Sequence, residues 1–351
     1  MADLFENPMG TDGFEFVEYC HENPQVLRDL FTQLGFKQTA THKSKKVTLW
    51  QQGDINFILN EEPDAMQFAK DRNGGAACAM GFRVKDAQKA YARAIEKGAK
   101  PVESTAAEGE LKIPAVEGIG GSKLYFVDIY GDKGTIYQHD FNFTDTAPNR
   151  GAGLTYVDHL THNVNRGNMD KWANFYTDLF NFREIRYFDI EGKLTGLKSR
   201  AMTSPCGKIR IPINESSDDK SQIEEFLKRY NGEGIQHIAF GTDDIYATVE
   251  TLLAHGVEFQ ETKDTYYARV DERVPGHGED LERMQKLNIL VDGAPTKGQG
   301  LLLQIFTKDA IGPIFYEIIQ RKGNEGFGEG NFKALFQSLE DDQVRRGVLK
   351  A

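Results

Sequence analysis

The amino-acid sequence predicts an α+β protein of two domains that repeat one structural pattern. A segment rich in Asn, Thr, Pro and Gly, "NFTDTAPNRGAG", lies between two apolar strands and is typical of an interdomain linker. It predicts domains over residues 1–149 and 150–351. In each half, a strand, a polar turn and an amphipathic helix ending at glycine match in register, over residues 80–103 and 238–261. The repeated unit is therefore one helix with several mainly antiparallel strands, and it occurs twice in each half.

Each half also begins with a short strand followed by a helical stretch, "FEFVEYCHENPQVLRDLF" in the first and "LTYVDHLTHNV" with "WANFYTDLF" in the second. Short strands are predicted between the helices. Near the C-terminus, the Gly-rich run "GFGEGNF" precedes a helix with apolar residues at i, i+3, i+4 and i+7, namely Phe332, Leu335, Phe336 and Leu339. This helix either packs on the core or forms a hinged lid over the site, and the pattern alone leaves both interpretations open.

The composition narrows the class of protein. The 351 residues are 39% hydrophobic and 27% charged, as in a globular protein with a sizeable core. A net charge of -11 argues against binding to nucleic acid or to an anionic membrane. The 3 cysteines are scattered without a CxxC pair, which argues against a disulfide framework or a thiolate zinc site. No apolar run has membrane-spanning length and no signal-peptide pattern is found, so we expect a cytoplasmic protein.

One histidine is predicted on the apolar face of a buried strand, where a polar ring is unexpected. His237, in the apolar strand "GIQHIAF", shares a face with Ile235 and Ala239. Aligning the two halves puts Ala79 opposite His237. Aligning "FVEYCHEN" on "YVDHLTHN" without gaps puts Tyr19 opposite His159, and aligning "GTIYQHDF" on "PIFYEIIQ" puts Gln138 opposite Glu317. Two histidines and a glutamate gained together in one half are hard to explain by packing, so the sequence predicts a metal site in the second half.

The predicted ligand set indicates open-site metal chemistry. His159, His237 and Glu317 come from strands far apart in sequence, and they leave about three coordination positions free. Open positions suit a chelating substrate and dioxygen at Fe(II), or water at Zn(II) or Mn(II). His162 points to the other face of its strand, so we expect it at the surface or beside a ligand rather than in the set.

Residues near the predicted ligands suggest a pocket for an aromatic substrate with a polar end. Gln304 and Phe306 share one strand face, and Phe315 shares a face with Glu317. Ser199, Asn214 and Gln222 are further polar candidates, although composition alone does not single them out.

Several long runs carry a resemblance to a known family. "DHLTHNV", "FREIRYFDI", "NGEGIQHIAF", "DTYY", "LLLQIFTK", "EIIQRKG" and "GFGEGNFKALF" resemble the 4-hydroxyphenylpyruvate dioxygenases of the vicinal-oxygen-chelate superfamily, over essentially the whole chain. The resemblance implies two domains of paired βαβββ modules, each forming an open barrel, with a C-terminal lid helix. It implies Fe(II) as the cofactor, with 4-hydroxyphenylpyruvate and O2 as substrates. Oxidative decarboxylation, ring hydroxylation and side-chain migration would then give homogentisate and CO2, in tyrosine breakdown.

The resemblance also assigns residues by motif position. The implied metal ligands are His159, His237 and Glu317. The place of Gln236 in the implied substrate pocket is less straightforward, because an ideal strand points its side chain away from His237. We expect Gln236 to support the ligand rather than to bind substrate directly. The implied polar catalytic set is Ser199, Asn214, Gln222 and Gln304, and the implied substrate pocket is Phe306, Phe315, Phe327, Phe332, Phe336, Gln236 and Asn331.

Two alternatives and two expectations complete the hypothesis. 4-Hydroxymandelate synthase uses the same metal and substrate, but carries a smaller aliphatic residue where this chain has Phe306, which favours ring hydroxylation. A metal-free binding protein on the same scaffold would bind no iron and take up no oxygen. We expect a homo-oligomer, a dimer or tetramer, assembled through the metal-free first half. No nucleic-acid or membrane partner is expected.

Overall fold

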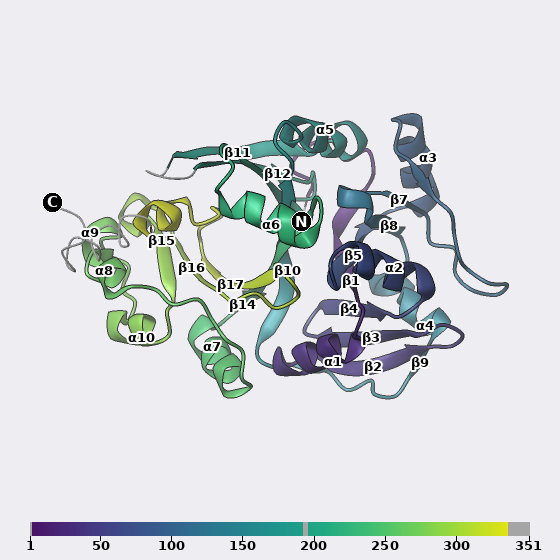
Figure 1. Cartoon of the computed structure of the whole chain (residues 1–351), viewed down its shortest axis with the longest axis horizontal. Helices are drawn as coiled ribbons and strands as arrows, with labels where there is room; N and C mark the ends of the chain where they lie inside the picture. The colour runs from purple at the N-terminus through teal and green to yellow at the C-terminus, as the bar shows by residue number, and fades with distance from the viewer. Residues whose placement is uncertain (1, 192–195, 336–351) are drawn as a thin grey trace.

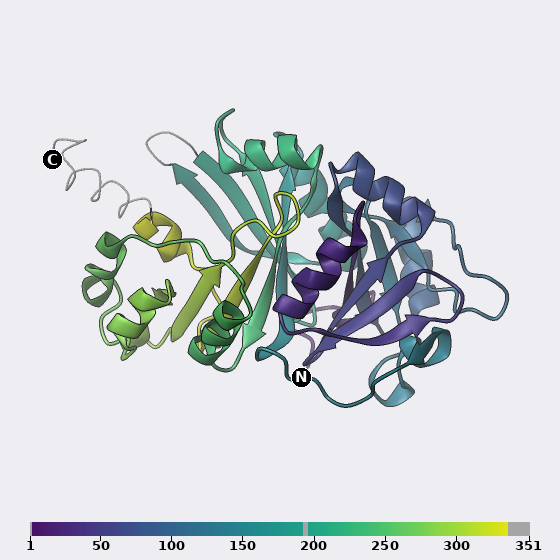
Figure 2. The same cartoon turned by 60° about the horizontal axis from the view of Figure 1, so that its bottom comes forward.

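The structure is a computed structural model that describes residues 2–191 and 196–335 (Figure 1). Two curved sheets lie side by side, one built from the first half of the chain and one from the second, with most helices on their outer faces. The turned view in Figure 2 shows the strands of the second half curving into an open half-barrel.

The first half forms the 9-stranded sheet, in the order β6-β7-β8-β5-β1-β4-β3-β2-β9. Its helices and strands are β1 Thr11–His21, α1 Pro24–Gln33, β2 Lys37–His42, β3 Val47–Gln52, β4 Ile55–Asn60, α2 Pro63–Asp71, β5 Gly75–Val84, α3 Ala87–Glu96, β6 Pro101–Val102, β7 Ala115–Glu117, β8 Lys123–Val127, α4 Ile136–Asp140 and β9 Phe141–Phe143, with short 3₁₀ turns at Ile119–Gly121 and Gly131–Lys133.

The second half forms the 8-stranded sheet, in the order β11-β12-β13-β10-β14-β17-β16-β15. A final helix begins at residue 329 and is described to residue 335. The other elements are β10 Leu154–Val164, α5 Met169–Phe180, β11 Arg183–Glu191, β12 Gly196–Thr203, β13 Arg210–Ser216, α6 Gln222–Tyr230, β14 Gly234–Thr242, α7 Ile245–Ala254, α8 Asp264–Tyr267, α9 Val270–Arg273, α10 Leu281–Lys286, β15 Leu290–Gly293, β16 Leu301–Phe306 and β17 Phe315–Lys322, with a 3₁₀ turn at Pro295–Lys297.

Each half contains two modules of one strand, one helix and three further strands, which confirms the predicted duplication. β1 pairs parallel with β4 and antiparallel with β5, and β10 pairs in the same way with β13 and β14. The matching helices also start alike, since Asp86 before α3 and Asp244 before α7 each accept a hydrogen bond from a backbone N–H three residues on. Such N-caps satisfy amides that the first helical turn leaves without partners.

Aromatic side chains join the two halves into one core. The Phe36 and Phe57 rings stack at 4.1 Å, and Phe57 lies 5.7 Å from Phe240 of the second half. Phe240 in turn contacts Tyr316 at 5.3 Å. Stacked and tilted ring contacts of this kind add to the free energy that burial of the rings provides. The predicted boundary after residue 149 lies between β9 and β10, the last strand of one sheet and the first of the other.

The structure corrects two of the three internal counterparts that the sequence alignment predicts. Gln138 lies in helix α4, so the strand that corresponds to β17 is β8, the parallel partner of β5. Gly81, the counterpart of Ala239, is paired with Tyr125 on β8 and with Phe16 on β1. The bulges of β1 and β10 fall at equivalent places, so the two strands do match without gaps, but Phe16 matches His159 and Tyr19 matches His162. The sequence alignment that put Tyr19 opposite His159 was therefore offset along the strand.

The corrected counterparts still contain no set of metal ligands. Phe16, Ala79 and Tyr125 stand where the second half has its two histidines and its glutamate. The Phe16 and Tyr125 rings lie 5.6 Å apart and belong to a separate buried apolar cluster, which also takes in Ile136 and Tyr137 of α4. The interior of the first half is therefore filled with side chains. In the described part of the chain, no helix has the length and apolarity needed to span a membrane.

Candidate metal centre

Three adjacent strands bring the predicted ligands together. On β14, Ala239 is paired with His159 of β10 on one side and with Glu317 of β17 on the other. His237 lies two residues before Ala239, so its side chain leaves the same face of the sheet. The small methyl group of Ala239 leaves the space between the three side chains open.

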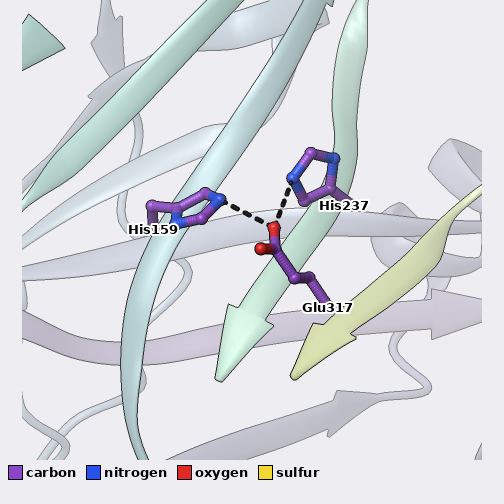
Figure 3. Close-up of side chains that lie close together, drawn as sticks. All are labelled: His159, His237 and Glu317. Carbon is purple, nitrogen blue, oxygen red and sulfur yellow. Dashed lines mark ion pairs between the residues drawn. The ribbon is translucent and has the colours of Figure 1, made fainter. Parts of the chain in front are cut away.

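The three side chains converge on one carboxylate oxygen (Figure 3). Glu317 Oε2 lies 3.1 Å from His159 Nε2 and 3.4 Å from His237 Nε2. The residues are only 3%, 8% and 2% exposed for His159, His237 and Glu317, and the ligand atoms lie within 4.8 Å of one another. Within residues 2–191 and 196–335, this is the group of three or more His, Cys, Asp or Glu residues that is close enough to hold a metal ion.

The hydrogen bonds of both imidazoles fit metal binding through Nε2. His159 Nδ1 lies 2.8 Å from Asp158 Oδ1, and His237 Nδ1 lies 3.0 Å from Gln236 Oε1. Each oxygen accepts the proton of Nδ1, which leaves the lone pair on Nε2, the nitrogen that points at Glu317. The donor set of two imidazoles and one carboxylate is also the facial set of open non-haem Fe(II) sites. The residues present therefore fit a divalent metal ion.

Electrostatics favour positive charge at the centre. Burial opposes ionisation of Glu317, but the two neighbouring histidines overcome it and hold the pKa of Glu317 down at about 2. Burial lowers the pKa of His237. It also lowers the pKa of His159, but the carboxylates of Glu317 and Asp158 more than offset this and raise it above its ordinary value. A buried carboxylate needs a cationic partner, and a divalent metal serves as well as an imidazolium.

A β-bulge explains how Gln236 reaches His237. Thr161 and His162 are consecutive on β10, yet they pair with His237 and Ile235, so Gln236 is the extra residue of a bulge. The bulge turns its side chain toward the ring of the next residue instead of to the opposite face. The alternation expected for an ideal strand is therefore wrong at this position, because Gln236 contacts the ring of His237. The implied place of Gln236 in the substrate pocket stays a prediction.

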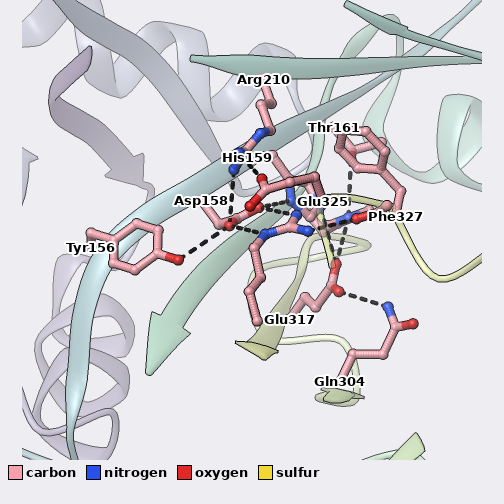
Figure 4. Close-up of polar contacts among 12 residues, drawn as sticks. Tyr156, Asp158, His159, Thr161, Arg210, Gln304, Glu317, Glu325 and Phe327 are labelled. Carbon is pink, nitrogen blue, oxygen red and sulfur yellow. Dashed lines mark hydrogen bonds and ion pairs between the residues drawn. The ribbon is translucent and has the colours of Figure 1, made fainter. Parts of the chain in front are cut away.

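The residue before His159 is the buried Asp158, whose carboxylate is paired with two arginines, Arg321 and Arg210, of which Figure 4 labels Arg210. Asp158 accepts hydrogen bonds from Arg321 Nε at 2.7 Å and from Arg321 Nη2 at 2.8 Å, and a longer one from Arg210 Nη1 at 3.3 Å. Burial opposes its ionisation, but the hydrogen bonds from Arg321 and His159 hold the pKa of Asp158 far below its usual range. Sequence reasoning missed Asp158 and Arg321, although the adjacent "DH" pair is a signal that could have suggested the former.

The second carboxylate oxygen of Glu317, Oε1, accepts a hydrogen bond from a series of linked side-chain amides. Gln304 Nε2 donates to Glu317 Oε1 at 2.8 Å, and Asn331 Nδ2 donates to Gln304 Oε1 at 2.7 Å. Asn331 Oδ1 accepts from the Tyr266 hydroxyl at 2.6 Å, and that hydroxyl also accepts from Arg273. In this structure the side chains of Gln304 and Asn331 are bonded to Glu317 and to each other. Their predicted roles, Gln304 in the polar catalytic set and Asn331 in the substrate pocket, stay predictions.

The predicted aromatic residues divide into three groups. Phe315 stacks on His237 at 4.9 Å, Phe306 lies 6.4 Å from the same ring, and Phe327 meets His159 edge-on at 5.4 Å. Phe332 is 38% exposed on the final helix, and no contact in the described residues places it at the metal centre. Phe336 lies outside the described residues.

The remaining polar candidates are only partly brought together. Ser199 and Asn214 are paired neighbours on β12 and β13, and Asn214 Nδ2 donates to Asn163 Oδ1 at 3.3 Å. Gln222 begins α6 and is exposed, and no hydrogen bond in the described residues links it to the metal centre. Of the two places expected for His162, the surface is wrong, and no hydrogen bond in the described residues links its side chain to a metal ligand. His162 is fully buried, and its Nε2 lies 2.7 Å from the Tyr176 hydroxyl.

Comparison with known proteins shows which families and structures this chain resembles. The family model described as "Hydroxyphenylpyruvate dioxygenase, HPPD, N-terminal" matches residues 5–142, and that of the "Glyoxalase/Bleomycin resistance protein/Dioxygenase superfamily" matches residues 156–271. The chain is 63% identical to a 4-hydroxyphenylpyruvate dioxygenase of Pseudomonas aeruginosa, over 98% of this chain and 97% of the relative. It is 62% identical to a protein named hemolysin VllY of Vibrio vulnificus, over 98% of both chains.

Among solved structures, a mutant 4-hydroxymandelate synthase from Streptomyces coelicolor matches with a TM-score of 0.80 and 25% identity, over 95% of this chain and 100% of that chain. The paired βαβββ modules and the buried His, His and Glu cluster define an enzyme of the vicinal-oxygen-chelate type. Within that class, the chain belongs to the 4-hydroxyphenylpyruvate dioxygenase family.

Proposed function

We propose that this chain is an Fe(II)-dependent dioxygenase that converts 4-hydroxyphenylpyruvate and O2 to homogentisate and CO2. The observation that carries the proposal is the buried cluster of His159, His237 and Glu317, whose ligand atoms lie within 4.8 Å of one another. The full-length identity to a 4-hydroxyphenylpyruvate dioxygenase supports the choice of substrate. Fe(II), when bound, supplies the positions that a chelating 2-oxo acid needs and the electrons that start dioxygen reduction.

The protein's own residues bind and orient the substrate. Two neutral imidazoles and one carboxylate leave a net positive charge on a divalent site, which favours a 2-oxo acid anion. The rings of Phe315 and Phe306 lie beside His237 and form an apolar wall suited to the aromatic ring. Gln304 fixes Glu317 while Gln236 and Asp158 fix the histidines, so the ligands keep their orientation during turnover.

We also propose the finer points of cellular context and assembly. The first half, whose counterpart positions are Phe16, Ala79 and Tyr125, acts in assembly of a homo-oligomer in the cytoplasm and binds no metal. The final helix from residue 329 closes over the substrate as a lid, since it starts beside Phe327 and carries Asn331. Light scattering on the purified chain tests the oligomer, for which a monomer at micromolar concentration is the contradicting result.

A second candidate function is 4-hydroxymandelate synthesis, which the structural likeness to such an enzyme favours. Phe306 lies 6.1 Å from Phe315 and fills the wall where the sequence analysis expects a smaller residue in that enzyme. The bulk of Phe306 supports ring hydroxylation over attack at the side chain.

The deciding experiment measures oxygen uptake by the purified chain with Fe(II) and 4-hydroxyphenylpyruvate and identifies the product by chromatography. Homogentisate with one CO2 per O2 is the expected result. Hydroxymandelate as the product would replace the first function with the second. Bound iron without oxygen uptake would contradict both.

A further inference from the structure

Asp158, whose carboxylate contacts His159, lies at a β-bulge of its strand. On β10, Val157 and His159 pair with the consecutive residues Phe240 and Ala239, so Asp158 is the extra residue of a bulge. The bulge brings the side chains of Asp158 and His159 together, at 2.8 Å. Gln236 stands in the same position before His237. Each histidine of the metal centre is therefore preceded by a bulged residue whose oxygen accepts from its Nδ1.

The first half contains the counterpart of this carboxylate. On β1, Phe14 and Phe16 pair with the consecutive residues Phe82 and Gly81, so Glu15 is also the extra residue of a bulge. Glu15 is 3% exposed, and Arg83 Nε donates to its Oε2 at 2.5 Å. Asp158 is 1% exposed and is likewise paired with an arginine. Both carboxylates line a cavity of about 410 Å³ between the halves.

The two carboxylates differ in the residue that follows each of them. Glu15 precedes Phe16, which has no proton to place, whereas Asp158 precedes His159. Arg321 holds Asp158 with two donors and also donates to the carbonyls of Asn324 and Gly326, at 3.0 and 2.7 Å. A planar guanidinium bound at four points leaves the carboxylate one orientation.

We propose that Asp158, clamped by Arg321, is a positioning residue that holds the proton of His159 on Nδ1 and so keeps Nε2 free to bind the metal. The bulge supplies the contact, the arginine fixes the carboxylate, and the carboxylate fixes the tautomer and plane of the imidazole. This inference rests on the proposed metal site, and it concerns affinity for the metal rather than the oxygenation step.

The substitution Asp158→Asn tests the inference with little change in volume. An amide has one acceptor oxygen, and the donors of Arg321 compete for it. The NH2 group then faces His159 Nδ1, which favours the tautomer with its proton on Nε2 and blocks that nitrogen as a ligand. The matched control is Glu15→Gln, which alters the corresponding bulge and cavity wall in the half without the metal.

The measurement is the dissociation constant of metal-stripped protein for Co(II), by chelator competition, together with the Co(II) absorption spectrum and the thermal unfolding midpoint. Asp158→Asn is expected to weaken Co(II) binding about 10- to 100-fold, as loss of an outer partner of a metal-ligating histidine typically does. Glu15→Gln is expected to retain the affinity and spectrum of the unaltered chain, even where both variants unfold at lower temperature.

Equal Co(II) affinities for Asp158→Asn and the unaltered chain would overturn the inference, as would an equal loss in Glu15→Gln. Failure of the unaltered chain to bind Co(II) would contradict the proposed function as well. If Asp158→Asn does not fold, Arg321→Lys replaces it, since lysine keeps the charge but loses the paired contact. Weaker Co(II) binding by that variant supports the clamp, and unchanged binding overturns it.

Discussion

At the scale of single residues, the metal centre depends on which atoms of each side chain are already used in hydrogen bonds to neighbouring residues. Glu317 is 2% exposed and uses Oε1 to accept from Gln304, so Oε2 alone faces the two histidines. A buried carboxylate is costly without a cationic partner. Its presence between two imidazoles is therefore the strongest single sign of metal binding in the described chain.

Replacing Glu317 by alanine is expected to abolish both Fe(II) binding and oxygen uptake. The variant leaves two neutral imidazoles as the only ligands and removes the negative charge of the site. Metal content after desalting and oxygen uptake measure the two effects. Glu258→Ala, which removes a glutamate whose side chain is 73% exposed, serves as the control and is expected to change neither. Retained turnover in Glu317→Ala would contradict the assignment of the ligand.

Replacing Phe306 by isoleucine is expected to divert part of the product from homogentisate to hydroxymandelate. The smaller side chain removes part of the wall that faces Phe315, so the substrate ring has more freedom relative to the metal. Chromatography of the products under saturating O2 measures the ratio. Phe68→Ile, in α2 of the first half, is expected to leave the ratio unchanged. An unaltered ratio in Phe306→Ile would argue against a role for this ring in specificity.

At the scale of strands and helices, regular periodicity predicted most of the elements but gave the wrong strand face at β-bulges. The strand-helix modules follow from apolar patterning. The predicted ligands came from comparison of the two halves, although two of the three counterparts used in that comparison were wrong. Period-two alternation, however, places Asp158 and Gln236 on the wrong face, because each is the extra residue of a bulge. Bulges leave no clear mark in a single sequence, so alternation alone could not place these two side chains beside the histidines.

Long-range pairing was equally hidden from the sequence. Arg321 contacts Asp158, Asn331 contacts Gln304, and Tyr266 contacts Asn331, each pair coming from separate elements. Nothing in the local pattern distinguishes these polar residues from solvated ones. The helical position of Gln138 was missed for a related reason, because a short helix next to a strand shares its apolar residues.

Tyr266 of α8 links the final helix to the strands that carry the site, and its hydroxyl has several buried partners. It donates to Asn331 Oδ1 at 2.6 Å and accepts from Arg273 Nη2 and from the backbone N–H of Val291. Tyr266→Phe is expected to lower the free energy of unfolding by about 1–3 kcal/mol, because these groups stay buried without a partner. Urea unfolding monitored by circular dichroism measures the change.

The control for this loss is Tyr187→Phe on β11, where the tyrosine is 47% exposed and water replaces the hydroxyl's contacts. Surface changes of this kind alter the free energy of unfolding by less than about 0.5 kcal/mol. Equal effects of the two substitutions would show that the buried hydroxyl contributes nothing beyond an exposed one.

At the scale of the whole molecule, duplication has produced two similar sheets with different interiors. In the second half, Ala239 separates His159 from Glu317, and the ligand atoms of the predicted metal site lie within 4.8 Å of one another. In the first half, Gly81 separates Phe16 from Tyr125, and α4 completes an apolar cluster there. The same topology therefore supports a reactive centre in one half and a filled core in the other.

This asymmetry predicts one metal ion per chain. Phe16, Ala79 and Tyr125 offer no imidazole or carboxylate, so the first half has nothing to bind a second ion at the corresponding place. Elemental analysis of the protein after loading with Fe(II) or Co(II) and desalting measures the stoichiometry. Two tightly held ions per chain would contradict the assignment of the first half as metal-free.

The placement of the ligands on three neighbouring strands has a consequence for how metal is acquired. His159, His237 and Glu317 are held by backbone ladders that exist before any ion arrives, so the entropy of ordering them is lost during folding and not during binding. Small metal-dependent domains behave in the opposite way, since their chains order only around the ion. Here a chelator is expected to strip the ion from a chain that stays folded, so that one metal replaces another by simple exchange.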